Sequence, residues 1–230
     1  MCSRYSVTIR EKEALKEYAI PIPKDFEPNY NLAPTQLGLV VTADQPAEAQ
    51  TMHFGLIPFW AKDTKLNIST LNAKSEEALE KTTWKPLIEK HKRCLVFADG
   101  FYEWDRSSGS PLPWRFVVKG RMMFSFAGLW SQWKSKDGSI VYRSFSIMTT
   151  EANDMVAKVH EKKRMPVILH KEDEALWLSK DLGPQEVLSL CDTYPDELMD
   201  CYRVSAELNA AAIKRVPNNK PEFILPINSL

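Results

Sequence analysis

The sequence predicts an α+β fold in which a curled, mostly antiparallel and barrel-like β-sheet is flanked by short helices. Three observations indicate it. Runs of β-branched and aromatic residues dominate residues 94–148, helical segments are few and short, and strands do not alternate with helices in the regular way that builds a parallel sheet. Because 44% of the 230 residues are hydrophobic, the chain can bury one core, and we expect a single domain over residues 1–230.

The N-terminal part is expected to begin with a helix and then to turn irregular. Residues 10–19 favour a helix because no helix breaker occurs before Pro21. Residues 20–36 hold several prolines and asparagines, which predicts an extended, turn-rich passage.

The remaining elements follow from hydrophobic runs and from the turn residues between them. Strands are expected at residues 36–43, 50–57, 94–98, 114–118, 123–130 and 140–148, with the polar residues 43–47 separating the first two and turns at 107–109 and 136–138. Helices are expected at residues 75–91 (with Pro86 starting a second helix after a break), 150–159 (capped by Thr150 with Asn153 or Asp154), 171–179 and 184–190.

Composition excludes several classes of protein. No run approaches the roughly 18 apolar residues of a membrane span, and charged residues occupy the start of the chain, so we expect a cytoplasmic protein without membrane contact. Lys plus Arg equals Asp plus Glu at 30 each, so any binding site for a polyanion must be local. The four cysteines are far apart and form no CxxC pair, which predicts neither a metal site nor a disulfide framework, and we expect no cofactor.

Cys2 is the most informative residue. Removal of Met1 would make it the N-terminus, with an α-amine and a thiol that are both nucleophilic near neutral pH. The amine can condense with an aldehyde to a Schiff base, and the thiol can then close a thiazolidine ring on the same carbon. A cysteine at position 2 is more often without such a role, so the rest of the sequence must decide.

Asn72 and Glu103 stand where plain strands or turns need no polar group. Asn72 lies at a predicted strand-to-helix junction and would more often be a helix cap. Glu103 follows an apolar strand and lies between Tyr102 and Trp104. Desolvation there would raise its pKa and suit it to general acid or base catalysis. A partly exposed carboxylate is an equally good interpretation of that segment alone.

His160 lies near the predicted end of a helix and is followed by a cluster of cations. Neighbouring positive charge favours a neutral imidazole that can act as a base. The segment is not a zinc-protease motif, because Arg164 stands where the second histidine would be. A lone histidine at a helix terminus is more often structural.

The joint pattern resembles the SOS-response-associated peptidase (SRAP) family, also called HMCES-type proteins. The resemblance covers essentially the whole chain. It rests on the Met1-Cys2 start and on residues 30–34, 55–60, 71–76, 94–104, 160–169, 203–205 and 221–224. Proteins of this family resemble sensors of abasic sites in single-stranded DNA that trap the open-chain sugar aldehyde as a thiazolidine.

The resemblance implies roles for particular residues and single-stranded DNA containing abasic sites as the partner. Cys2 would be the nucleophile, Asn72 would orient the sugar or the N-terminal residue, and Glu103 and His160 would move protons. The residues implied in DNA binding are Arg4, Lys74 and Arg164 for phosphates and Pro34, Phe59 and Trp60 for flanking bases.

Two positions depart from the family pattern. Lys74 stands where the family often has arginine, which reduces a bidentate phosphate contact to a point charge. The spacing between His160 and Arg164 is longer than in the commoner family form, which enlarges the loop between them.

Two other functions fit the same residues. In the first, Cys2, Glu103 and His160 form an N-terminal-nucleophile hydrolase or autopeptidase that also removes Met1. In the second, the protein is a DNA-damage binding module in which Cys2 is incidental.

Overall fold

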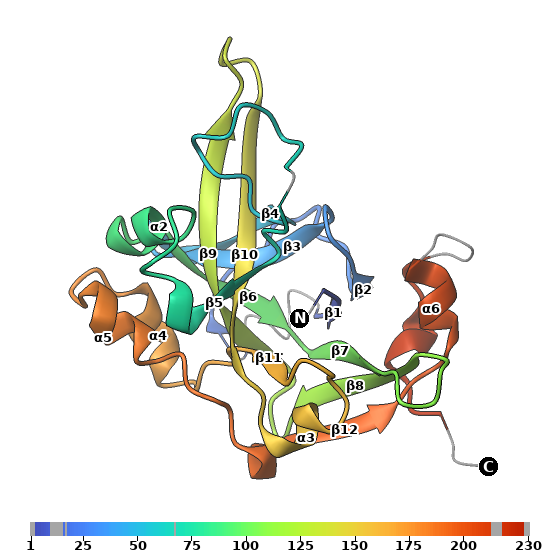
Figure 1. Cartoon of the computed structure of the whole chain (residues 1–230). Coiled ribbons are helices and arrows are strands. Elements are labelled where there is room, and N and C mark those ends of the chain that lie inside the picture. The colour runs from blue at the N-terminus through green and yellow to red at the C-terminus, as the bar shows by residue number, and fades with distance from the viewer. Residues whose placement is uncertain (1–2, 10–15, 17, 67, 213–217, 228–230) are drawn as a thin grey trace.

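A closed ring of strands forms the centre of the protein (Figure 1). The computed structural model describes residues 3–9, 16, 18–66, 68–212 and 218–227. The ring consists of β4 (Gln45–Phe54), β3 (Leu37–Thr42), β6 (Arg93–Ala98), β9 (Phe124–Lys134) and β10 (Val141–Glu151). β10 closes it by pairing antiparallel with β9 and parallel with β4, which confirms the predicted barrel-like sheet.

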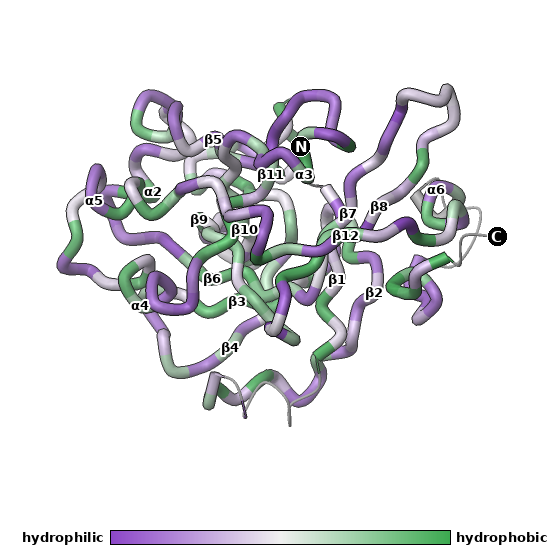
Figure 2. Tube along the Cα trace, turned by 90° about the horizontal axis from the view of Figure 1, so that it is seen from below, coloured by the Kyte–Doolittle hydropathy of each residue, from purple (hydrophilic) through white to green (hydrophobic). Residues whose placement is uncertain are grey.

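The central parts of the ring strands are buried, and β6 is the clearest case. Every residue of β6 is buried, and Figure 2 shows hydrophobic colouring along the central strands and hydrophilic colouring on much of the outer chain. β6 and β9 approach so closely that a Cβ atom on Gly128 would lie 2.7 Å from Val96 Cγ2 and 2.8 Å from Cys94 Sγ. Gly128 therefore permits this strand contact.

A second, antiparallel sheet lies beside the ring. Its order is β12 (Met199–Arg203), β8 (Leu112–Val118), β7 (Gly100–Asp105), β1 (Tyr5–Val7) and β2 (Asn29–Leu32). Asp99 alone separates β6 of the ring from β7 of this sheet, and its carboxylate makes a buried ion pair of 2.8 Å with Arg115. This link fixes where β7 leaves the ring and therefore where Glu103 lies.

β10 also carries two short strands beyond the ring. β5 (Asn72–Lys74) pairs parallel with it and β11 (Arg164–Pro166) pairs antiparallel. Thr149 is opposite Lys74 in one pairing and opposite Pro166 in the other. Lys74 and Pro166, about 90 positions apart in the sequence, are therefore both neighbours of Thr149 in β10. β5 and β11 lie on the same side of the molecule in Figure 2.

The helices are short and lie around the sheets. They are η1 (Ser75–Glu77), α2 (Lys85–Glu89), α3 (Asp154–Ala157), α4 (Asp173–Leu178), α5 (Pro184–Leu188), η2 (Asp196–Leu198), α6 (Glu207–Ala212) and η3 (Pro221–Ile224). Pro86 lies in the first turn of α2, as predicted, because its missing N–H needs no partner there. No helix in the described part of the chain is long and apolar enough to cross a membrane.

Several predicted boundaries were wrong. β4 begins at Gln45, so residues 43–47 do not separate two strands as predicted, and it ends at Phe54 instead of residue 57. Residues 75–91 do not form continuous helix up to Pro86, since turns lie between η1 and α2. Most of the helix predicted over residues 10–19 lies outside the described residues.

The helix predicted over residues 150–159 starts later than expected. Thr150 continues β10 opposite Met165, so it cannot cap the helix. Asn153 is the N-cap instead, and its side-chain oxygen accepts a hydrogen bond of 2.9 Å from the backbone N–H of Val156. α3 then ends at Ala157, which leaves His160 in the loop that follows it.

Candidate active site

A polar pocket of about 190 Å³ lies where the second sheet meets the loop after α3. We call it the Glu103 pocket. Its lining residues are Ser3, Glu103, Trp104, Arg106, His160, Glu161 and Lys162. Three chain segments that are distant in sequence therefore meet there: the start of the chain, the end of β7 with its following turn, and the loop between α3 and β11.

Glu103 is the buried carboxylate of this pocket. It pairs with Trp114 across β7 and β8, and only 4% of its surface is exposed. Within the described residues, its Oε1 atom has no hydrogen-bond partner. Desolvation raises its pKa to about 7, against a smaller opposing effect of the Arg106 cation. Near neutral pH, Glu103 is therefore able both to donate and to accept a proton.

His160 is held as a neutral imidazole. Its Nδ1 atom accepts a hydrogen bond of 3.1 Å from the backbone N–H of Arg164. Because a backbone amide only donates, Nδ1 carries no proton, and the neutral ring carries its proton on Nε2. Burial lowers the pKa of His160 to about 4, and the Lys162 and Arg106 cations lower it further. The ring is thus uncharged at neutral pH.

The two groups face each other across a short gap. Nε2 of His160 lies 3.7 Å from Oε2 of Glu103, which is longer than a hydrogen bond. Their pKa values are shifted in opposite directions, both toward the neutral form. Such a pair can pass protons to and from a reacting group that lies beside both atoms.

Asn72 begins β5 and lies opposite Ile147 of β10. Its Nδ2 atom is buried and has no hydrogen-bond partner within the described part of the structure. An unpaired buried donor costs roughly 1–3 kcal/mol, so folds seldom retain one unless a ligand or water uses it. Asn72 does not line the Glu103 pocket, and its proximity to Glu103 and His160 stays a prediction.

Arg4, Lys74 and Arg164, the cations predicted to hold phosphates, all have partners. Arg4 Nη1 donates a hydrogen bond of 2.8 Å to Asn218 Oδ1, and Lys74 Nζ lies 2.6 Å from Glu77 Oε1. Arg164 makes a two-pronged ion pair with Glu76, and its Nη2 donates a hydrogen bond of 2.7 Å to the Thr149 carbonyl oxygen. DNA phosphates would have to compete with these protein groups.

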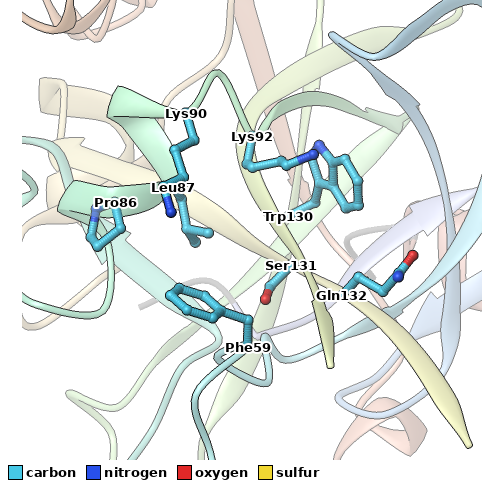
Figure 3. A pocket seen from close by; sticks show the side chains of 8 residues that line it. All are labelled: Phe59, Pro86, Leu87, Lys90, Lys92, Trp130, Ser131 and Gln132. Carbon is cyan, nitrogen blue, oxygen red and sulfur yellow. The ribbon is translucent and has the colours of Figure 1, made fainter. Parts of the chain in front are cut away.

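The residues predicted to stack on bases divide into two groups. The side chains of Phe59 and Trp60 are 50% and 52% exposed, in the segment after β4. Phe59 lines a pocket of about 310 Å³ with Trp130, and Lys90 Nζ lies 5.5 Å from the centroid of its ring (Figure 3). Pro34 is half-buried between β2 and β3, and it lines neither this pocket nor the Glu103 pocket.

Cys2 itself lies outside the described residues. Ser3, to which it is covalently bonded, lines the Glu103 pocket. Sequence reasoning missed Arg106 and Lys162 as lining residues of this pocket. Arg106 follows the aromatic motif that contains Glu103, and Lys162 belongs to the cation cluster after His160. Nothing in the sequence distinguishes either residue from the charged residues around it.

Comparisons with known proteins agree with the resemblance seen in the sequence. The abasic site processing protein YoqW of Bacillus subtilis (strain 168) is 35% identical over 231 residues, which cover 97% of this chain and 99% of YoqW. The abasic site processing protein HMCES of Pongo abelii is 28% identical over 246 residues, which cover 90% of this chain and 67% of HMCES.

Solved structures show the same fold. A crystal structure of a protein from Bacteroides thetaiotaomicron superposes with a TM-score of 0.87 at 28% identity, covering 99% of this chain and all of that one. A second, from Bordetella bronchiseptica, gives a TM-score of 0.79 at 26% identity over 89% of this chain. The sequence model of the family described as SOS response associated peptidase (SRAP) matches residues 1–211. This chain therefore belongs to the SRAP family.

Proposed function

We propose that this protein processes abasic sites in single-stranded DNA by forming a covalent bond to them through Cys2. The relatives named above are abasic site processing proteins. The observation that carries the proposal is the pairing of buried Glu103 with neutral His160, 3.7 Å apart, in a pocket that Ser3 also lines. Ser3 follows Cys2 directly in the sequence, which supports the choice of Cys2 as the nucleophile for this pocket.

The reaction begins at the ring-opened sugar. The α-amine of Cys2, freed by removal of Met1, attacks the aldehyde carbon and forms a carbinolamine. A proton delivered to its hydroxyl group lets water leave and gives the imine. The Cys2 thiol then adds to the same carbon while its proton passes to the imine nitrogen. One water is released in total, and the product is a thiazolidine.

Glu103 and His160 supply the proton transfers that these steps need. Glu103 with a pKa of about 7 can protonate the leaving hydroxyl group and then accept the thiol proton. His160 carries its proton on Nε2, which faces Glu103 Oε2, and acts on the ring-opened sugar hydroxyl. The unpaired Nδ2 donor of Asn72 orients the sugar or the N-terminal residue.

A denaturing gel tests the proposal. Wild-type protein, Cys2→Ala and Cys201→Ala are mixed with single-stranded DNA that carries an abasic site, and with undamaged DNA. Cys201 is a half-buried cysteine elsewhere in the fold and serves as the matched control. A heat-stable shifted band is expected for wild type and Cys201→Ala with damaged DNA only. Its absence from wild type whose Met1 has been removed would contradict crosslinking.

We also propose that the chain removes its own Met1, which the family's description as a peptidase favours. Synthesis in a cell-free system without methionine aminopeptidase separates this from removal by another enzyme. Intact mass is expected to show Met1 lost from wild type and retained in Glu103→Gln. Equal retention in both proteins would contradict self-processing. Cleavage of added peptides without DNA would instead favour the hydrolase alternative.

A further inference from the structure

Two cations of the Glu103 pocket are free to bind a ligand. The side chains of Arg106 and Lys162 are exposed and line this pocket, and neither makes an ion pair or a side-chain hydrogen bond with the rest of the described structure. Arg4, Lys74 and Arg164, in contrast, all bind protein groups. The two unengaged side-chain cations that line this pocket are thus residues that the family pattern does not identify.

Arg106 and Lys162 reach the pocket from different parts of the chain. Arg106 lies in the turn between β7 and β8, and Lys162 lies in the loop between α3 and β11. Both cations lower the pKa of His160, as charges close to that ring do.

The surroundings favour an anion over these two cations. The His160 ring is neutral at pH 7, and Glu103, with its pKa raised to about 7, is only partly ionised there. Glu161 is the exposed carboxylate of the pocket, so the two cations exceed the negative charge of the lining. Arg106 and Glu161 also line an adjoining pocket of about 320 Å³, to which Lys158 adds a further cation and Asp105 a carboxylate. The two cations and two carboxylates of that adjoining pocket balance, so the excess of positive charge is confined to the Glu103 pocket.

We propose that Arg106 and Lys162 together bind one phosphodiester of the lesion-bearing strand at the mouth of the Glu103 pocket. This rests on the proposed function, because a strand whose sugar reacts with Cys2 must place a neighbouring phosphate near the pocket. The planar guanidinium of Arg106 can donate two hydrogen bonds to the phosphate oxygens, and Lys162 adds a point charge from the other wall.

Equilibrium binding tests the phosphate site without any covalent chemistry. The probe is single-stranded DNA carrying a tetrahydrofuran abasic analogue, which has no aldehyde, and fluorescence anisotropy is recorded over a range of salt concentrations. The test protein is the double variant Arg106→Gln/Lys162→Gln. The matched control is Lys85→Gln/Lys180→Gln, which removes the same charge at two exposed lysines outside the pocket.

The test variant is expected to bind at least about tenfold more weakly than wild type, as loss of charge-assisted hydrogen bonds predicts. The slope of log K against log salt concentration is expected to become shallower by about 0.7, the value for one phosphate contact on a single strand. The control should retain nearly wild-type affinity. Arg106→Lys should keep the slope and lose part of the affinity. Equal losses in the test and control variants would overturn the proposal.

Failure of this inference and failure of the proposed function give different results. If wild type crosslinks to abasic DNA but the test variant binds the analogue as wild type does, the phosphate site is wrong and the reaction stands. If wild type binds the analogue through Arg106 and Lys162 but never crosslinks to an aldehyde, the phosphate site stands and the reaction is wrong. Thermal unfolding of each variant confirms that it is folded before binding is compared.

Discussion

Oε2 of Glu103 lies 3.7 Å from Nε2 of His160, and both residues are more than nine-tenths buried. Burial pushes both groups toward their neutral forms, with the pKa of Glu103 raised to about 7 and that of His160 lowered to about 4. A buried ion pair at this position would be costly. Two neutral proton carriers are instead available near neutral pH, which is what imine formation and ring closure require.

Replacing Glu103 by glutamine should stabilise the protein at high pH. Below pH 4.5, the carboxyl is neutral in both the folded and the unfolded state. As the pH rises toward 7, the unfolded chain loses its proton first, so the folded wild type loses stability relative to Glu103→Gln. The shift from 4.5 to about 7 corresponds to roughly 3 kcal/mol. Urea unfolding at pH 5 and pH 8.5 measures the change, and Glu80→Gln is the exposed control.

Glu103→Gln should also abolish most crosslinking while leaving the protein folded. Glutamine keeps the size of the side chain but cannot carry a proton between groups, and loss of a general acid or base typically slows a reaction by about 10²–10⁴-fold. Crosslinking followed over time at pH 7 provides the rate. A wild-type rate in this variant would contradict the role given to Glu103.

Asn72→Ala is expected to slow crosslinking at least about tenfold without destabilising the fold. Because Asn72 Nδ2 is buried and unpaired in the described structure, removing it breaks no hydrogen bond from that atom, and the free energy of unfolding should change by less than about 1 kcal/mol. The crosslinking rate and the free energy of unfolding, measured together, separate a role of Asn72 in orienting the substrate from a role in stabilising the fold. A large loss of stability with an unchanged rate would indicate a structural role.

Asn153→Ala should destabilise the fold and leave the crosslinking rate nearly unchanged, the reverse of Asn72→Ala. Asn153 caps α3 through Val156, and its Nδ2 donates a hydrogen bond of 2.8 Å to the buried carbonyl oxygen of Tyr194. Losing both contacts should lower the free energy of unfolding by roughly 2–3 kcal/mol. The crosslinking rate at 15 °C, where the variant remains folded, should be close to that of wild type.

Removing the partner of Arg164 should strengthen DNA binding. Glu76 holds the guanidinium of Arg164 while its own side chain is 50% exposed, so a phosphate that uses Arg164 must displace it. Glu76→Gln removes this competing anion and should tighten binding of the tetrahydrofuran probe about fivefold, equivalent to roughly 1 kcal/mol. Glu77→Gln removes the carboxylate that pairs with Lys74 instead. Comparing its affinity with that of Glu76→Gln shows whether the gain is specific to Arg164. Weaker binding by Glu76→Gln would contradict a phosphate role for Arg164.

Local patterns predicted the strands of the ring well. β6 and the first part of β9 are mostly apolar, and such runs are visible in one sequence, although β9 continues to Lys134, past the predicted end at residue 130. The bounds of β5 were not predicted beyond a strand-to-helix junction near Asn72, and β11 was missed, because each has three residues and is stabilised by pairing with β10. Pairing between distant segments leaves no local signal. The same reason explains β4, whose first residues, Gln45 and Pro46, look like a turn until β3 pairs with it.

In the candidate site, too, the local features could be predicted from the sequence and the contacts between distant residues could not. Residue type and surroundings made Glu103 and His160 candidates, because a carboxyl among aromatics and a histidine among cations are local features. Their roles came from the family resemblance, since the local features fitted structural interpretations as well. The ion pair between Arg164 and Glu76 joins residues 88 positions apart, so its effect on the predicted phosphate contact was not foreseen. Arg106 and Lys162 became distinct from other exposed cations only when the fold placed them on one pocket.

The intact mass of the protein–DNA product tests the covalent role of Cys2 most directly. Wild-type protein is incubated with a short single strand that carries one abasic site, and the product is weighed under denaturing conditions. The expected mass is that of the protein without Met1 plus the DNA minus one water, with Cys2 identified as the modified residue by peptide fragmentation. An adduct on a lysine, an adduct that retains Met1, or an equal yield from Cys2→Ala would contradict thiazolidine formation at Cys2.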